Sequence, residues 1–168
     1  MITPELLQTM SQYNRWQNAS VYGAADTLTA EARQADRGAF WGSIEATLNH
    51  LLWGDRMWLW RFGAGDPPRN KTIEGMLSEG GDWDSLKAAR QQQDAAIAAW
   101  VAKVEQSQLD RSMTFFSVAV NRELTRNVGL LALHMFNHQT HHRGQVHAML
   151  TAAGAKPEDT DIPFMPGL

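Results

Sequence analysis

The sequence predicts an all-α protein built as a four-helix bundle. Four long stretches repeat apolar side chains at intervals of three and four residues, the pattern of amphipathic helices, and together they cover most of the 168 residues. The segments between them contain glycine, proline and serine. No internal repeat or linker divides the chain, so we expect one domain over residues 1–168 with a sizeable core.

The first predicted helix runs from about Pro4 to Leu28. Thr3 is a plausible N-cap, because its hydroxyl can accept a bond from a first-turn N–H, and proline suits the first helical position. Tyr13 and Gln17 are polar groups on the apolar stripe. Two interpretations stay open for them: hydrogen bonding within the core, or lining a pocket.

The second predicted helix runs from about Ser43 to Phe62, with Ser43 as its cap. It is apolar nearly all round, and such a helix is usually buried on two sides. In a small bundle the second side would be another subunit, so we expect a homodimer through this helix. The tryptophans between positions 53 and 60 suit a core, an interface or the wall of a ligand pocket.

Residues 64–82 are predicted to form a loop with one short turn at Ile73–Leu77. A third helix is expected from about Ser85 to Gln106. Residues 111–122 alternate apolar and polar side chains in places. This segment therefore forms either a short strand pair or an extended connection.

The fourth predicted helix runs from about Arg126 to Ala153, and Gly154 is a good C-terminal stop. Gly144 lies inside it and costs about 1 kcal/mol relative to alanine. We therefore expect another helix or a ligand to approach Gly144 closely. Apolar side chains in residues 157–168 predict that the tail packs back on the bundle.

Five of the six histidines fall in this fourth helix. His138 and His142 are four residues apart, so they share one face and can bind one ion together. A helical wheel places both in the middle of the predicted core-facing stripe. It places His134 and His141 on the flank of that stripe, and His147 on roughly the opposite side.

Burying two imidazoles without partners would cost several kcal/mol, and a metal ion removes that cost by binding neutral nitrogens. His50 in the second helix could supply a third nitrogen, leaving coordination positions open as a catalytic metal requires. The alternatives are a hydrogen-bonded core pair and a solvated histidine-rich face. A zinc-peptidase motif is excluded, because no glutamate lies between the ligands.

Arg143 lies next to His142 in the same helix. We expect it to form an ion pair or a helix-terminal contact, in preference to binding a substrate anion.

Composition excludes several classes of function. The chain has no cysteine, hence no disulfide, thiolate ligand or cysteine nucleophile. A formal net charge of −3 with scattered basic residues predicts neither nucleic acid nor an anionic membrane as a partner. No apolar run of about 18 residues and no signal-peptide pattern occur, so a cytoplasmic location is expected.

Two segments carry a resemblance to a known family. Residues 47–55 read Thr-Leu-Asn-His-Leu-Leu-Trp-Gly-Asp, and residues 134–145 read His-Met-Phe-Asn-His-Gln-Thr-His-His-Arg-Gly-Gln. With residues 13–18 and Thr160-Asp161, they resemble the DinB family of the DinB/YfiT-like superfamily over essentially the whole chain.

The resemblance implies a four-helix bundle with crossover connections, often a homodimer, and a divalent metal held by three histidines. By position those ligands are His50, His138 and His142, with water completing the coordination. Zinc or nickel is expected first, and iron, manganese or cobalt would also suit three imidazoles. Characterised relatives are transferases or isomerases that use thiols such as bacillithiol or mycothiol, whereas many members have no assigned reaction.

The leading hypothesis is a metal-dependent enzyme acting on a small molecule, either a hydrolase or a thiol-dependent transferase. Any thiol must come from a cosubstrate, because the chain has no cysteine. Glu45 and Asp55 are candidate bases that the sequence alone does not place near the metal. The alternatives are a non-catalytic metal-binding stress-response protein, and a structural bundle that binds metal adventitiously.

Overall fold

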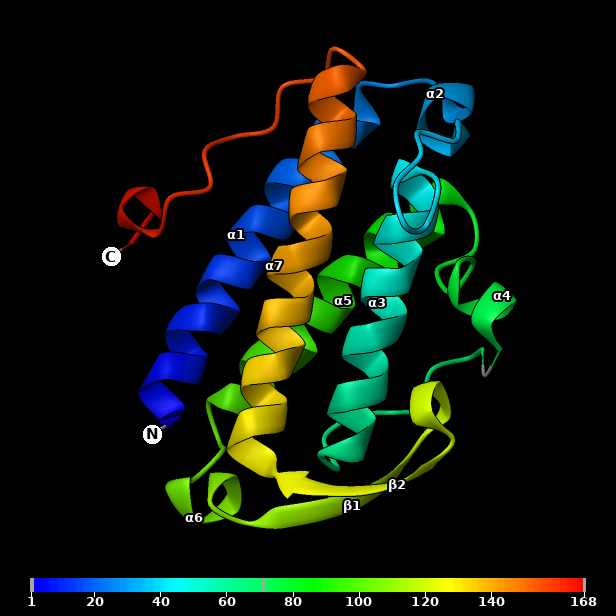
Figure 1. The fold of residues 1–168 in the computed structure, drawn as a ribbon. Coiled ribbons are helices and arrows are strands. Elements are labelled where there is room, and N and C mark those ends of the chain that lie inside the picture. The colour runs from blue at the N-terminus through cyan, green and yellow to red at the C-terminus, as the bar shows by residue number, and fades with distance from the viewer. Residues whose placement is uncertain (1, 71, 168) are drawn as a thin grey trace.

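Four long helices pack side by side in the computed structural model, which describes residues 2–70 and 72–167 (Figure 1). They are α1 (Pro4–Asp26), α3 (Ile44–Arg61), α5 (Trp83–Val101) and α7 (Val128–Ala152). Helices α1 and α7 run in one direction, and α3 and α5 run in the other (Figure 1). The predicted all-α four-helix bundle is confirmed, with one small sheet added. In the described ranges no helix has both the length and the apolar character needed to cross a bilayer.

Short elements join the long helices. A single helical turn, α2 (Ala30–Gln34), which the sequence reading missed, precedes α3, and α4 (Ile73–Met76) is the short turn predicted in the loop. Because α3 and α5 are parallel, the connection that carries α4 must return along the bundle (Figure 1). The buried carboxylate of Glu79 holds this connection, accepting bonds from Arg56 at 2.6 Å and from the backbone N–H of Arg69 at 2.9 Å.

Capping side chains define where the helices begin. Thr3 and Ser43 cap α1 and α3 as predicted, each accepting a first-turn backbone bond. The cap of α5 is Asp82, since Asp82 Oδ1 accepts the Ser85 N–H at 2.8 Å. The third long helix therefore starts at Trp83.

The end of α5 also differs from the prediction, because the helix stops at Val101 rather than at Gln106. A separate turn, α6 (Gln106–Leu109), follows. Glu105 and Gln108 cap it reciprocally, side chain to backbone in both directions. This capping box starts a new helix and so interrupts the apolar periodicity that suggested a continuous one.

A β-hairpin lies across one end of the bundle (Figure 1). Its strands are antiparallel: β1 (Ser112–Ser117) and β2 (Arg122–Asn127). The strand pair that was one alternative for residues 111–122 is thus present, but its second strand lies further along the chain. Helix α7 consequently begins at Val128 and not at Arg126, with Asn127 as its N-cap.

The core consists of two apolar clusters, one toward each end of the bundle. Between them lies a layer of buried polar side chains, the polar layer, to which all four long helices contribute. Its members are Asn14, Asn18, Asp55, Arg90, Asp94, Gln139 and Arg143.

Ion pairs and amide contacts join the polar layer. Arg90 binds Asp55 at 2.8 Å and Asp94 at 2.9 Å. Arg143 donates to the side-chain oxygen of Asn14, and to that of Gln139 at 3.0 Å. The ion pair or helix-terminal contact expected for Arg143 is therefore wrong: amide oxygens hold this guanidinium inside the bundle.

The C-terminal tail packs back on α1, as predicted. Tyr13 Oη donates to the carbonyl of Thr160 at 2.9 Å, and Gln17 Nε2 donates to that of Asp159 at 2.8 Å. Of the apolar side chains expected to make this contact, Met165 is buried, whereas Ile162 and Phe164 are exposed. The two polar groups on the α1 stripe are thus hydrogen-bonded where the tail meets the bundle.

Candidate metal centre

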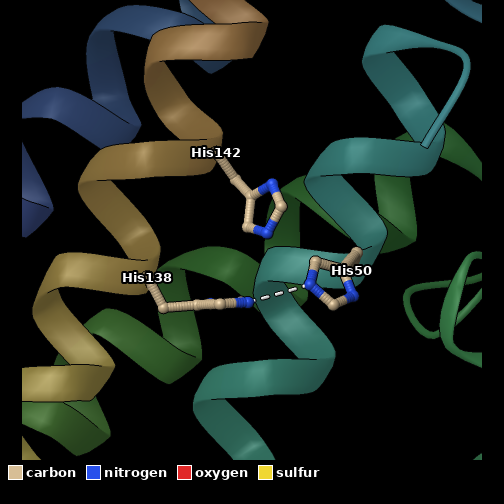
Figure 2. A group of neighbouring side chains, drawn as sticks. All are labelled: His50, His138 and His142. Carbon is tan, nitrogen blue, oxygen red and sulfur yellow. Dashed lines mark hydrogen bonds between the residues drawn. The ribbon is translucent and has the colours of Figure 1, made fainter. Parts of the chain in front are cut away.

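Three histidines converge between facing helices. His50 lies on α3, and His138 and His142 lie one turn apart on α7 (Figure 2). One nitrogen from each ring lies within 4.8 Å of the others. The closest pair is His50 Nε2 and His138 Nε2, 2.9 Å apart. Within residues 2–70 and 72–167, this is the one group of at least three histidine, aspartate or glutamate side chains with such spacing.

A glycine brings the two helices this close. Gly54 lies one turn after His50, and a Cβ there would be 3.1 Å from His138 Cε1. By contrast, a Cβ at Gly144 would meet nothing within 4 Å, and Gly144 is exposed. The close approach predicted at Gly144 is therefore wrong, and the close contact occurs at Gly54. The sequence indicated this contact only through the presence of a glycine inside a predicted helix, one turn from a histidine.

The wheel assignment of α7 also needs correction. The centre of its core face is occupied by Phe136, Gln139 and Arg143, all buried. His138 is half-buried and His142 is 7% exposed, so the pair sits at the edge of that face. Gln139 and Arg143 lie at the centre because the polar layer supplies hydrogen-bond partners for them. A helical wheel places residues in the core by hydrophobicity alone, so it does not predict this.

Hydrogen bonds orient two of the rings. His142 Nδ1 lies 2.8 Å from the amide oxygen of Gln145, which can only accept, so Nδ1 carries the hydrogen. His50 Nδ1 lies 3.1 Å from the thioether of Met76, again an acceptor. Each ring then presents an unprotonated Nε2, which for His50 faces His138 Nε2 at 2.9 Å. Outer partners prepare imidazoles for a metal in this way. Met76 comes from the α3–α5 connection, and no local pattern indicated it.

Burial keeps these imidazoles neutral. Burial first, and the charges of neighbouring histidine rings second, lower the pKa of His50 and of His138 to about 3 each. Burial also lowers the pKa of His142, although the hydrogen bond to Gln145 acts in the opposite direction. Since a metal binds the unprotonated nitrogen, rings of this kind are available as ligands at neutral pH.

The donor set fits a divalent transition metal. Two nitrogens bound to one ion lie about 2.0–2.1 Å from it, so His50 and His138 at 2.9 Å are close enough to share it. Three imidazoles leave at least one coordination position free. The indole of Trp41 lies beside His50, with ring centroids 4.3 Å apart and the ring planes tilted by 33°, and shields that side of the group.

Neither carboxylate considered as a base lies free at this centre. Asp55 is fully buried in the polar layer beside Arg90. Glu45 approaches Arg33 at 3.5 Å and accepts a bond from Gln34. His134 and His141 are exposed, His147 is partly buried, and all three lie outside the three-nitrogen group.

A cavity of about 930 Å³ opens beside the histidines. Its wall includes His138 and His134 from α7, Trp58 from α3 and Phe115 from β1, and it is mostly apolar. The hairpin thus forms one side of the cavity. Sequence reasoning did not connect the hairpin with the site, because the two meet only in the folded chain.

Fold and site together define a four-helix bundle whose facing helices bring three imidazoles to the edge of a cavity. The profile of the DinB family matches residues 1–167, and the chain belongs to that family. It is 24% identical over 165 residues to Protein DinB of Bacillus subtilis (strain 168), an alignment covering 89% of this chain and 87% of that protein.

A solved structure shares the fold. The crystal structure of a DinB-like protein from Bacillus cereus ATCC 10987 superimposes with a TM-score of 0.65 at 16% identity. The match covers 86% of this chain and 91% of the other. At that identity the likeness supports the architecture of the bundle.

Proposed function

We propose that this chain holds one divalent metal ion on His50, His138 and His142 and is a metal-dependent enzyme acting on a small molecule. One observation carries the proposal: His138 belongs both to the three-nitrogen group and to the wall of the cavity. Bound there, an ion with free coordination positions would lie within reach of a molecule in that cavity. Zinc or nickel is proposed first, with iron, manganese or cobalt as alternatives.

The proposed reaction is hydrolysis or transfer to a thiol. When bound, the ion would supply Lewis acidity, which lowers the pKa of water or of a thiol and so favours the nucleophile. The chain's own residues would orient the ligands, through Gln145 and Met76, and surround the reactants with apolar walls. A thiol would have to come from a cosubstrate, since the chain has no cysteine. A cavity of this size has room for two small reactants.

A second candidate is a non-catalytic metal-binding stress-response protein. One observation favours it: among the described residues, no carboxylate lines the cavity to act as a general base. The two candidates differ in whether a bound metal supports turnover.

The test begins with elemental analysis of untagged protein. The protein is then loaded with zinc, nickel, manganese, iron or cobalt and screened with small thiols plus electrophiles, and with esters and amides. Turnover that follows metal content and disappears after chelation would support the enzyme. Stoichiometric metal without turnover in any pairing would favour the non-catalytic alternative, and no retained metal would contradict both.

A further inference from the structure

Two arginines interrupt the apolar wall of the cavity. Arg61, in the last turn of α3, and Arg126, on β2, both line it. Among the described residues, neither takes part in an ion pair. Arg56, on the same helix as Arg61, instead binds Glu79 at 2.6 Å. A cation that lines an apolar cavity without a carboxylate partner is a candidate for ligand recognition.

The guanidinium of Arg61 is held in place. It lies over the ring of Trp58, 4.8 Å from its centroid, and over that of Phe115, at 4.5 Å. It also donates to the carbonyl of Phe116 at 3.1 Å. One such bond leaves other N–H donors of the fork free to bind an anion.

Partial burial makes an anionic partner favourable for this group. Arg61 is half-buried, and desolvation lowers its pKa below the ordinary value. A guanidinium nevertheless stays protonated in proteins. It therefore remains a poorly solvated charge that an anion would stabilise, and the aromatic rings around it keep it oriented.

The positions of Gly54 and Arg61 along α3 indicate the length of the ligand. Gly54 contacts His138, and Arg61 lies seven residues further along α3. At 1.5 Å per residue, the Cα atoms of Gly54 and Arg61 are separated by about 10 Å along the helix axis. Trp58 and Met57 line the cavity between these two points.

We propose that the cavity binds an amphipathic carboxylate: a small molecule with an aromatic or acyl body about 10 Å long. Its carboxylate binds Arg61 and Arg126, its body lies along Trp58 and Phe115, and its other end reaches the three-histidine group. The assignment of that other end as the reacting end rests on the proposed function. The choice of a carboxylate rests on the two arginines alone.

A matched ligand series tests this on the unmodified protein. The probes are 6-phenylhexanoate, 6-phenylhexanol and 6-phenylhexylamine, with binding followed by calorimetry and by tryptophan fluorescence. We expect the carboxylate to bind at least about tenfold more tightly than the alcohol, the usual size of a charged hydrogen bond, and the amine to bind most weakly. Equal affinities for the acid and the alcohol would overturn the proposal.

Variants locate the carboxylate. Arg61→Gln and Arg126→Gln should each reduce the preference for acid over alcohol while leaving alcohol affinity nearly unchanged. The control is Arg15→Gln, because Arg15 is exposed on α1, which contributes no residue to the cavity. A preference that persists in the Arg61→Gln/Arg126→Gln double variant would contradict the assignment.

The metal must be varied independently. The same titrations are made with metal-loaded and chelated protein, and metal content is measured in each variant. The preference should persist in chelated protein, and Arg61→Gln should keep its metal. A preference lost on chelation would place the carboxylate on the metal and overturn this inference without touching the proposed function. Failure of the unmodified protein to retain metal, with the preference for the acid intact, would contradict the proposed function and leave this inference standing.

Discussion

At the residue scale, one glycine controls the distance between the ligating rings. We predict that Gly54→Ala will weaken metal affinity severalfold, because its Cβ would press on His138 Cε1 from 3.1 Å and shift the ring by a few tenths of an ångström. Metal affinity is measured by competition with a chromophoric chelator. Circular dichroism should show an unchanged helical content.

Gly144→Ala is the matched control. It lies on the same helix as His138, and a Cβ there meets nothing within 4 Å. It should stabilise α7 by about 1 kcal/mol through helix propensity alone and leave metal affinity unchanged. Equal effects of the two alanines on metal affinity would show that the contact at Gly54 is unimportant.

The ligands can be tested singly. His138→Ala should abolish stoichiometric metal, since His50 and His142 would remain as two nitrogens, which hold an ion poorly. Elemental analysis after gel filtration measures this. His147→Ala should retain the metal, because His147 lies outside the group. The reverse result would mean that the ion binds elsewhere on α7.

At the element scale, the polar layer sets how the four helices stack. Each long helix places polar side chains at the same level, between the two apolar clusters. A helix that slid by one turn would leave buried charges such as Arg90 and Asp55 without partners. The layer therefore favours one register, and that register brings His50 opposite His138.

Breaking the layer should be costly. Arg90→Met removes the cation between Asp55 and Asp94. Burial raises the pKa of Asp55 even though the charge of Arg90 lowers it, so this carboxylate depends on its cation. We expect a loss of about 3–5 kcal/mol in the free energy of unfolding, the usual result of stranding a buried charge. Urea denaturation followed by circular dichroism measures it.

Lys87→Met provides the comparison on the same helix. Lys87 pairs with Asp26 at 2.8 Å, but at the surface, where solvent screens the pair. Its urea midpoint should stay close to that of the unmodified protein. If both variants unfold at the same urea concentration, the buried layer contributes no more than a surface pair.

At the scale of the whole molecule, metal and protons act on the same histidines. We predict that chelation lowers the melting temperature at neutral pH, because an ion that binds only the folded state stabilises it. Scanning calorimetry of loaded and chelated protein, with metal content confirmed, measures the difference. Identical melting temperatures would mean that the site contributes nothing to folding.

The pH dependence follows from the lowered pKa values. His50 and His138 have pKa values of about 3 when folded, against the ordinary 6.5 expected in the unfolded chain. Between these values the unfolded state binds more protons, so stability should fall as pH falls below about 6.5. Metal should be retained at pH 6.5 and released only in more acidic solution. Release centred at or above pH 6.5 would indicate solvent-exposed ligands.

Association of two copies is the remaining prediction at this scale. Trp60 near the end of α3 is 46% exposed, and Phe116 and Val118 on the adjacent hairpin region are exposed as well. We expect a homodimer that covers this surface. Light scattering at micromolar concentration should give the mass of a dimer. Trp60→Ser should weaken dimer association, whereas Phe40→Ser should leave it unchanged. A monomeric unmodified protein would contradict the prediction.

Local interactions made much of this molecule predictable. Thr3 and Ser43 were identified as caps because a cap bonds within its own first turn. His138 and His142 were placed on one face because a helix repeats every 3.6 residues wherever it packs. The bundle class followed from the same periodicity. The third histidine came from the resemblance and from the buried character of its helix.

Other features depend on which segments become neighbours. The sequence contains Gly54, Gln139 and Arg61, but nothing local shows that they face His138, the backbone of Leu51 and the ring of Phe115. The hairpin that completes the cavity wall was likewise misplaced by several residues. Short-range periodicity therefore determined the helices and the histidine pair. Only the tertiary structure decided the ring geometry, the polar layer and the cavity, because each requires contacts between residues far apart in the chain.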